Sequence, residues 1–271
     1  MEFETLLYEE KDGVAWITLN RPEVLNAFNS RMQLELRDLW RGLRGNEDVR
    51  VAVLTGSGDK AFCTGIDRGD IPVGDSGGER LIGSPGKTPF MLDDPGELIG
   101  PKSNDLWKPV IAAVNGIACG GAFYMLGEVD IIIAAEHATF FDPHVSYGMT
   151  ASFESMHMVQ KMPLGEVLRM QLMGNFERVS AERAYQVGLI SEVVPRDKLR
   201  EAAEWVAGVI AKHPPLAVQG TLRAIWAAKE LARTQALEIG YTFVKMGTNP
   251  ESIREGQAVF AAGERPQWRL R

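Results

Sequence analysis

The chain has 271 residues, 45% of them hydrophobic, which is enough to bury a sizeable core in one domain or two. Its 36 acidic residues outnumber its 29 basic residues, and the formal net charge of −7 provides no positive field that would attract nucleic acid. The first residues carry neither a basic leader nor an apolar run. The most apolar stretch, residues 109–127, contains four glycines and is typical of a buried segment rather than a membrane span. We therefore expect a cytosolic protein that binds neither membrane nor nucleic acid.

The predicted elements begin with a β-hairpin, because residues 5–9 and 14–19 alternate in polarity around a turn at residues 11–13. Ser30 is then expected to cap a helix over residues 31–43, whose apolar side chains fall on one face.

Short apolar runs rich in β-branched residues follow at residues 51–54 and 110–114, and a similar run lies at residues 130–134. Such runs, bounded by turn residues, are typical of strands in a covered sheet. A helix is expected near residues 121–126, between the second and third of these strands. This alternation of strands and helices predicts an α/β protein with a mostly parallel sheet.

Residues 69–101 differ from the rest of the chain because they are rich in glycine and proline. They predict a long loop, which could be a mobile lid or a tolerated surface insertion. From residue 199 onwards the pattern is helical, and helices are expected over residues 199–212, 215–231 and 232–246.

Two glycine-bearing bends, residues 62–67 and 115–121, each follow an apolar run. Glycine has no Cβ and lets the backbone approach a ligand, and a helix that begins nearby leaves its first N–H groups without internal partners. Two such bends could direct N–H groups toward one carbonyl oxygen, the arrangement that stabilises an enolate or a tetrahedral transition state. The two cysteines, Cys63 and Cys119, lie one in each bend and are expected to be free thiols.

Five stretches make the chain resemble the crotonase superfamily, also called the enoyl-CoA hydratase/isomerase family. These stretches are residues 20–27, 60–67, 108–116, 138–144 and 181–195. The resemblance implies an α/β fold with a repeated ββα spiral core over residues 1–198. It also implies a C-terminal helical region, residues 199–271, that packs on neighbouring subunits of a homotrimer or a dimer of trimers.

The resemblance further implies a substrate and a binding site. The family handles acyl groups linked to coenzyme A, so coenzyme A is expected as part of the substrate, without a separate cofactor or a metal. The backbone N–H groups of Ile66 and Gly121 would form the oxyanion hole. Arg21 could meet the phosphates of the substrate or be a solvated surface residue. The residues expected to contact the acyl-CoA are Asn26, Ala27, Cys63, Gly65, Ile66, Asp67, Gly120 and Gly121.

The catalytic side chains depart from the pattern of the family's hydratases, which use two glutamates. The corresponding positions hold Tyr124 and His144. A phenol with a pKa near 10 cannot replace a carboxylate base near neutral pH, so standard hydratase activity is in doubt. His144 becomes the candidate general acid or base because imidazole titrates close to neutral pH. The alternative is a histidine that only hydrogen-bonds within its loop.

Other side chains near these positions leave alternatives open. Tyr124 could donate a hydrogen bond to an enolate or only fill space, and the second is favoured. Asp142 could orient His144 or cap a turn. Glu154 is a weak candidate, near the position where some family members that hydrolyse or substitute acyl groups place an aspartate. His157 is expected at the surface or on a helix face.

Three functions are compatible with these features. The leading one is an acyl-CoA enzyme of the enoyl-CoA hydratase/isomerase family, a lyase or an isomerase, that stabilises an enolate or oxyanion with backbone N–H groups. The second is a protein that binds acyl-CoA without catalysis. The third is a hydrolase of a β-diketone that is not linked to coenzyme A.

Overall fold

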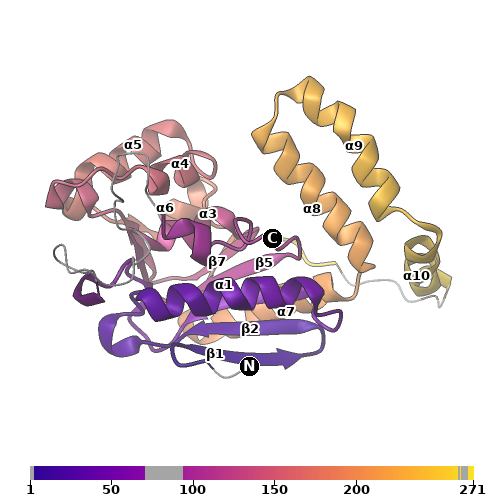
Figure 1. Ribbon diagram of the computed structural model, residues 1–271, viewed down its shortest axis with the longest axis horizontal. Helices are drawn as coiled ribbons and strands as arrows, with labels where there is room; N and C mark the ends of the chain where they lie inside the picture. The colour runs from indigo at the N-terminus through magenta and orange to yellow at the C-terminus, as the bar shows by residue number, and fades with distance from the viewer. Residues whose placement is uncertain (1–2, 71–93, 262, 264–267) are drawn as a thin grey trace, which may run out of the picture.

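The computed structural model describes residues 3–70, 94–261, 263 and 268–271 of the chain (Figure 1). Its larger sheet has six strands in the order β1-β2-β3-β5-β7-β10. They are β1 (Leu6–Lys11), β2 (Val14–Leu19), β3 (Val51–Gly56), β5 (Val110–Val114), β7 (Ile131–Ala135) and β10 (Glu192–Val194). β1 and β2 pair antiparallel and all other neighbours in this sheet pair parallel. The predicted hairpin and the mostly parallel sheet are confirmed.

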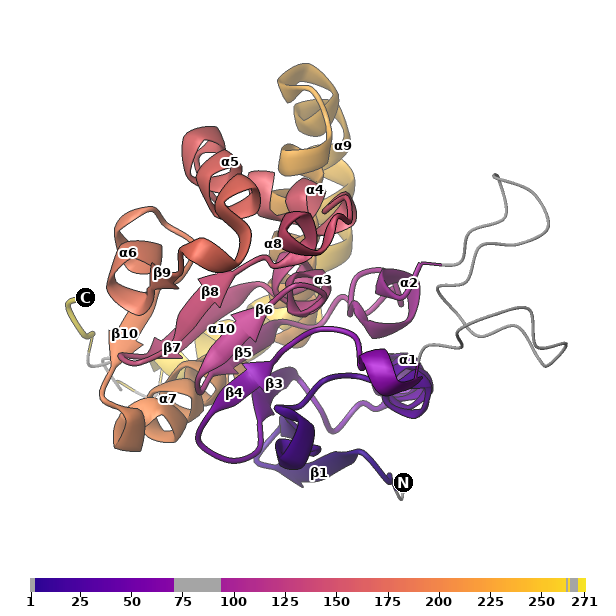
Figure 2. The ribbon, with the colours of Figure 1, turned by 90° about the vertical axis from the view of Figure 1, so that its left-hand side faces the viewer.

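A smaller sheet of four strands lies beside it, in the order β4-β6-β8-β9 (Figure 2). Its strands are β4 (Ala61–Cys63), β6 (Ile117–Cys119), β8 (Thr139–Phe141) and β9 (Val179–Ser180). β4, β6 and β8 pair parallel, and β9 runs antiparallel to β8. Because parallel neighbours end at the same edge of a sheet, the segments that follow these three strands meet there.

The helices of the described residues cover both faces of the larger sheet and extend beyond it. They are α1 (Ser30–Gly45), α2 (Gly96–Ile99), α3 (Ala122–Glu128), α4 (Phe153–Val159), α5 (Leu164–Met173), α6 (Ala181–Gln186), α7 (Leu199–Ala211), α8 (Pro215–Glu230), α9 (Arg233–Gly247) and α10 (Pro250–Ala261). Short 3₁₀ turns lie at Pro22–Val24, Arg68–Asp70, His144–Tyr147, Gly174–Phe176 and Arg196–Lys198. No helix among the described residues has the length and apolar character needed to cross a membrane.

The expectation that Ser30 caps the first long helix was wrong. α1 begins at Ser30, and the preceding Asn29 is its N-cap, with extended backbone and a side-chain oxygen that accepts a hydrogen bond from the N–H of Met32 at 2.9 Å. Asparagine and serine are both good N-caps by residue type. Asn29 is the cap because its backbone is extended, whereas Ser30 is already part of the helix.

The core has two layers, one on each face of the larger sheet. On one face, Leu36, Leu39 and Trp40 of α1 are completely buried against the sheet and α3. On the other face, Ala203 and Ala207 of α7 pack on the valines of β3 and on β5. Full burial of a large apolar side chain contributes about 1.5–3 kcal/mol, so these two layers fix the strands that carry the site.

The C-terminal helices differ in their packing. α7 is part of the core, whereas the α8–α9 hairpin stands away from it (Figure 1). Leu222 is the buried residue of α8, and Gly247 that of α9. Large apolar side chains such as Leu237 and Tyr241 stay exposed. The division of the chain at residue 198 and the packing of these helices on neighbouring subunits remain predictions.

Most of the glycine- and proline-rich segment 69–101, residues 71–93, lies outside the described residues. The prediction of a continuous loop is wrong at its end, where α2 forms. The carboxylate of Asp94 accepts a hydrogen bond from the N–H of Gly96 at 2.7 Å, and Ile99 is fully buried. The indole N–H of Trp40 donates to the carbonyl of Ile99 at 2.9 Å, which attaches this turn to α1.

Candidate active site

The two glycine bends predicted from the sequence lie against each other. They leave the ends of β4 and β6, which are paired in the smaller sheet. Gly65 has a φ of +87°, and a Cβ atom on it would lie 2.8 Å from the backbone nitrogen of Gly121. A Cβ on Gly121 would lie 2.7 Å from Cζ of Phe28. Such contacts are too short for any side chain, so glycine is required at both positions.

The backbone N–H groups of Ile66 in the first bend and Gly121 in the second have no backbone acceptor among the described residues. Phe28 pairs with the first bend, since its N–H donates to the carbonyl of Gly65 at 2.8 Å and its carbonyl accepts from the N–H of Asp67 at 2.9 Å. The intervening N–H of Ile66 and the N–H of Gly121 donate no backbone hydrogen bond within the part of the chain that the structure describes. Gly121 is buried and Ile66 is half-buried, and backbone N–H groups in such places are normally paired, so these two are available to a ligand.

Asn26, predicted to contact the substrate, is fully buried, and its side chain is bonded to the protein itself. Its amide nitrogen donates to the carbonyls of Ser57 and Ala61, each at 2.9 Å, and its amide oxygen accepts from the N–H of Arg21 at 3.0 Å. Its φ of +56° is in the left-handed region that asparagine tolerates. Asn26 therefore fixes the loop beside the first bend, and only its backbone can serve a ligand.

Arg21, a candidate for phosphate binding, forms an ion pair with Asp67 at 2.8 Å. The same guanidinium donates to the carbonyl of Ala27 at 2.8 Å. Arg21 thus joins residues 21–28 to the first bend. This is a positioning role that sequence patterns alone did not indicate.

Both cysteines are buried free thiols, as predicted. Burial raises the pKa of the Cys63 thiol to about 12, so it stays protonated near neutral pH. Its sulfur accepts a hydrogen bond from the N–H of Gly65 at 3.4 Å. Cys63 therefore supports the shape of the bend and is a poor nucleophile.

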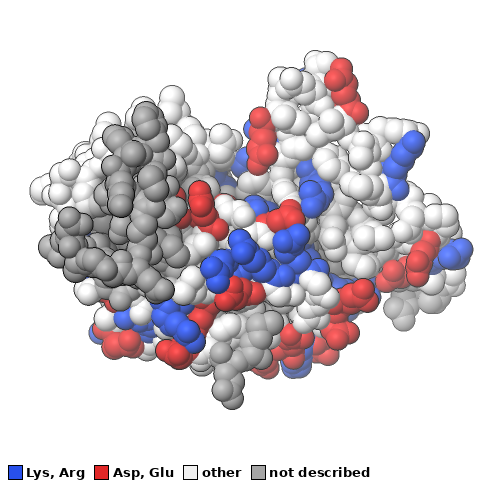
Figure 3. Space-filling view, viewed as in Figure 1, with Lys and Arg blue, Asp and Glu red and all other residues white. Residues whose placement is uncertain are grey.

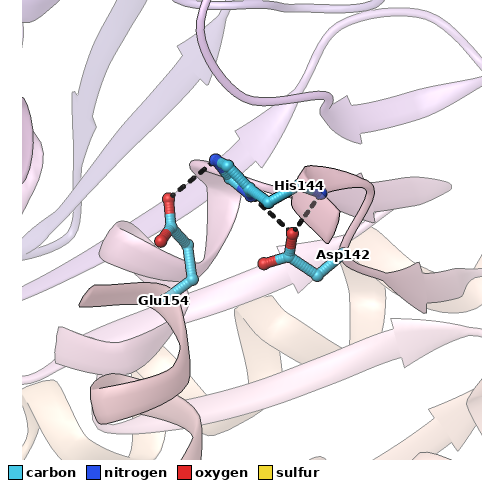
Figure 4. A group of neighbouring side chains, drawn as sticks. All are labelled: Asp142, His144 and Glu154. Atoms are coloured by element: carbon cyan, nitrogen blue, oxygen red, sulfur yellow. Dashed lines mark hydrogen bonds and ion pairs between the residues drawn. The ribbon is translucent and has the colours of Figure 1, made fainter. Parts of the chain in front are cut away.

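His144 lies between two buried carboxyl groups, as Figure 4 shows. Its Nδ1 is 2.5 Å from Oδ1 of Asp142, and its own backbone N–H donates to the same oxygen at 3.0 Å. Its Nε2 is 3.6 Å from Oε1 of Glu154 on α4. Asp142 therefore does both things that the sequence left open: it holds the turn and it orients the ring. His144 also lies beside the second bend, because its Cε1 is 3.7 Å from where a Cβ of Gly120 would be.

The environment changes the proton affinity of both His144 and Glu154. The hydrogen bond that the ring donates to Asp142 raises the pKa of His144, burial opposes this rise, and the charges of Asp142 and Glu154 add to it. Burial raises the pKa of the Glu154 carboxyl. The two groups face each other, and each retains its proton to higher pH than the same group does in water.

Tyr124, the other residue at a hydratase glutamate position, is buried on α3. Its hydroxyl donates to a carboxylate oxygen of Asp94 at 3.2 Å, and its ring meets that of His157 edge-on at 5.9 Å. Burial and the charges of Glu154 and Asp94 raise the pKa of Tyr124, so it stays a neutral hydrogen-bond donor. His157 lies on α4, on the helix face toward Tyr124, and burial lowers its pKa.

Sequence reasoning underestimated Glu154 and missed Asp94. Glu154 lies in the first turn of α4, and it is only 4% exposed because that face of the helix packs on the core through Met158. Its spacing from His144 was the only available signal. Asp94 lies in the segment predicted as loop, and no local pattern links it to Tyr124 thirty residues later.

The cluster of Asp142, His144 and Glu154 has donor atoms within 4.8 Å of one another, a spacing that a metal ion also allows. However, the imidazole stands between the two acids, with Nδ1 toward Asp142 and Nε2 toward Glu154. A single ion is not coordinated by opposite nitrogens of one ring, so this arrangement favours proton transfer over metal binding.

Comparison with known proteins shows the family of the chain. Residues 9–271 match the model of the enoyl-CoA hydratase/isomerase family. The chain is 33% identical to (E)-benzylidenesuccinyl-CoA hydratase of Thauera aromatica over 96% of its length and 97% of that protein. It is 31% identical to carnitinyl-CoA dehydratase of Salmonella arizonae, with 98% of each chain covered.

A solved enoyl-CoA hydratase/isomerase from Mycobacterium paratuberculosis superposes on the whole chain, with all of that protein covered, a TM-score of 0.87 and 39% identity. The α/β fold with its C-terminal helices is therefore that of the crotonases. The chain belongs to the enoyl-CoA hydratase/isomerase family of the crotonase superfamily.

Proposed function

We propose that the protein adds water to, or removes it from, an acyl-CoA thioester, with the oxygen of the thioester held by the N–H groups of Ile66 and Gly121. Removal of a proton from C2 of the acyl group places negative charge on that oxygen, and two preorganised donors stabilise it. Each donor of this kind is worth about 3 kcal/mol of barrier. The two unpaired N–H groups in touching bends support this assignment.

His144 is proposed as the group that moves the proton. The observation that carries this proposal is its position beside the second bend with a buried acid on each ring nitrogen. Asp142 holds the ring and favours its protonated form, as an acid does for a catalytic imidazole. Acid–base catalysis of this kind contributes about 10²- to 10⁴-fold in rate.

Glu154 is proposed to exchange a proton with His144 and to hold the water that is added or released. It supplies a carboxyl group although both hydratase glutamate positions carry other residues. Tyr124 keeps a neutral hydroxyl on the same side of the site. The acid pair around His144 favours catalysis over a protein that only binds acyl-CoA.

The reaction class rests on the relatives. The Thauera protein is named as a hydratase and the Salmonella protein as a dehydratase, both of CoA thioesters. The same chemistry on this chain requires the enolate site and one proton carrier, which Ile66, Gly121 and His144 would provide.

The test combines turnover with binding. A panel of 2-enoyl-CoA and 3-hydroxyacyl-CoA thioesters, crotonyl-CoA included, is assayed with the native protein and with His144→Ala, and coenzyme A binding is measured by calorimetry. We expect turnover of at least one thioester, a loss of about 10²-fold or more in kcat for His144→Ala, and unchanged coenzyme A binding. His137→Ala, at an exposed histidine, is the matched control and retains full activity.

Two outcomes would contradict the proposal. Binding of coenzyme A without any reaction across the panel would identify a binding protein. Failure to bind coenzyme A, together with cleavage of a β-diketone, would identify a hydrolase of substrates that are not linked to coenzyme A.

A further inference from the structure

A cavity lies between α8 and the core, with a volume of about 530 Å³. This volume is within the range of small-molecule sites. It includes Pro109 and Ile131, at the starts of β5 and β7. The bend with Gly121 follows the opposite end of β5, and a five-residue strand spans roughly 15 Å. The cavity is therefore separate from the candidate active site.

Most of its lining is apolar, but two lysines also line it. Lys161 comes from the segment after α4, and Lys229 comes from the last turn of α8. Their ammonium groups lie 5.2 Å and 5.3 Å from the centre of the Trp226 ring. Apolar side chains complete the wall: Ile131, Ile210, Leu222 and Ile225.

Neither lysine forms an ion pair with any residue that the structure describes. Lys161 donates to the carbonyl of Val129, and Lys229 to the carbonyl of Gln160, each at 2.6 Å. Among the described residues, no carboxylate forms an ion pair with either ammonium group. An ammonium group has three N–H donors, so each retains two for a ligand.

The nearest acid is already occupied. Asp130 accepts hydrogen bonds from Lys102 at 2.9 Å, from the N–H of Val110 at 2.7 Å and from the indole of Trp226 at 2.7 Å. The site thus gathers cations around one indole, with its acid satisfied by other donors. On the face drawn in Figure 3, basic side chains gather where the core meets the α8–α9 hairpin.

This arrangement weakens the binding of a proton by both lysines. Burial and the neighbouring Lys229 lower the pKa of Lys161 to about 8. Burial also lowers the pKa of Lys229. An anion placed between the two ammonium groups would relieve their repulsion, and an apolar chain attached to it would cover the indole and the aliphatic wall.

We propose that this cavity binds a carboxylate with an apolar tail, with the carboxylate between Lys161 and Lys229 and the tail along Trp226 and Ile225. Charge complementarity selects the anion, because both ammonium groups lie at the cavity and its one lining acid, Asp130, already accepts hydrogen bonds from Lys102, Val110 and Trp226. The apolar lining selects the tail over a small hydrated anion such as phosphate. The site is independent of the thioester chemistry proposed above.

The test is calorimetric titration of the full chain with sodium octanoate and with octan-1-ol. Octanoate binds saturably and at least tenfold more tightly than octanol. Lys161→Met and Lys229→Met keep the apolar stems, and each lowers octanoate affinity at least tenfold. Lys245→Met removes an exposed ammonium group on α9, outside the cavity, and leaves the octanoate affinity unchanged.

A measurement on the native protein adds a readout that does not depend on a variant folding. Lys161 faces Lys102, Asp130 and Glu128 on the core side and Lys229 on α8. Because the carboxylate needs the ammonium form, octanoate affinity falls as pH rises through about 8 and binding is accompanied by proton uptake there.

Three results would overturn the proposal. One is the absence of saturable octanoate binding to the native protein. Another is equal affinity for octanoate and octanol. The third is octanoate binding that is lost in His144→Ala but kept in both lysine variants, because that pattern places the acid in the acyl site of the enzyme.

Discussion

At the residue scale, the surroundings of His144 shift the pKa of its imidazole in opposite directions. The hydrogen bond and charge of Asp142 raise its pKa, and burial and the charge of Arg68 lower it. The raising effects prevail. The neutral imidazole, which is the form that accepts a proton, therefore becomes abundant only above the usual pKa of a histidine.

Asp142→Asn tests this assignment through the pH dependence of kcat. The amide can still hold the ring, but it lacks the charge that stabilises the imidazolium. If His144 acts as the base, the rising limb of the profile moves to lower pH in this variant, and the rate above the limb falls. Asp38→Asn, at an exposed acid of α1, leaves the profile unchanged. A limb that stays in place or moves to higher pH would contradict the role of His144.

Glu154 illustrates the stability cost of a functional acid. Burial raises its pKa, so the folded state binds its proton more tightly than the unfolded state does. The contribution of this group to the free energy of unfolding is therefore fully present below the ordinary glutamate pKa, and it is lost as pH rises through the raised pKa. Removing the charge should therefore stabilise the fold where the carboxylate would be ionised.

Glu154→Gln is expected to unfold at a higher temperature than the native protein at pH 8, and the difference should disappear toward pH 4. Its kcat falls at least tenfold, because glutamine cannot exchange a proton with His144. Thermal unfolding at a series of pH values and a turnover assay measure the two effects. A variant that is less stable than the native protein at pH 8, with full turnover, would show that Glu154 is structural.

At the scale of elements, the site depends on the pairing of β4 with β6. This pairing places the first bend against the second, and the hydrogen bonds of Phe28 then hold the first bend in position. The contact leaves no room for a side chain on Gly65 or Gly121. Catalysis should therefore be more sensitive than folding to a methyl group placed between the bends.

Gly65→Ala provides the test, with Gly188→Ala as its matched control. Both glycines have positive φ, +87° and +85°, but a Cβ on Gly188 meets nothing within 4 Å. Both substitutions carry the same backbone strain. We expect Gly65→Ala to lower kcat/KM by about 100-fold or more, the usual effect of losing one oxyanion donor. We expect Gly188→Ala to keep the kcat/KM of the native protein. Equal kcat/KM of the two variants would contradict the role of the bends.

At the scale of the whole molecule, the chain divides into a packed core and an open helical hairpin. α7 closes one face of the sheet, whereas α8 and α9 leave Leu216, Leu237 and Tyr241 exposed. Exposed apolar side chains of this density are typical of an interface. The trimer or dimer of trimers that the family resemblance implies is therefore a prediction that this surface makes testable.

Light scattering coupled to size exclusion tests that prediction. The native protein is expected at three or six times the mass of one chain. Leu237→Glu places a charge on the exposed face of α9 and should shift the measured mass toward that of a single chain. Glu238→Ala, at the next position on the same helix, is a control that keeps the assembly. A native protein that elutes as a single chain would contradict the prediction.

Much of this architecture could be predicted from local sequence. The strands β3 and β5 were apparent from their β-branched runs, and the bends from their glycines, because both are short-range properties. What local patterns could not provide were contacts between distant segments, such as Asp94 with Tyr124 or Glu154 with His144. These depend on where α2 and α4 pack, which tertiary burial decides. The cap at Asn29 was missed because its neighbour Ser30 is an equally good cap by residue type.

The most direct test of the central claim is a crystal structure of the protein with acetoacetyl-CoA, whose enol form resembles the proposed intermediate. We predict that the thioester oxygen lies about 2.7–3.1 Å from the backbone nitrogens of both Ile66 and Gly121, with Nε2 of His144 facing the reacting carbons. A thioester oxygen beyond hydrogen-bond distance of both amides, or His144 turned away from the acyl group, would contradict the account.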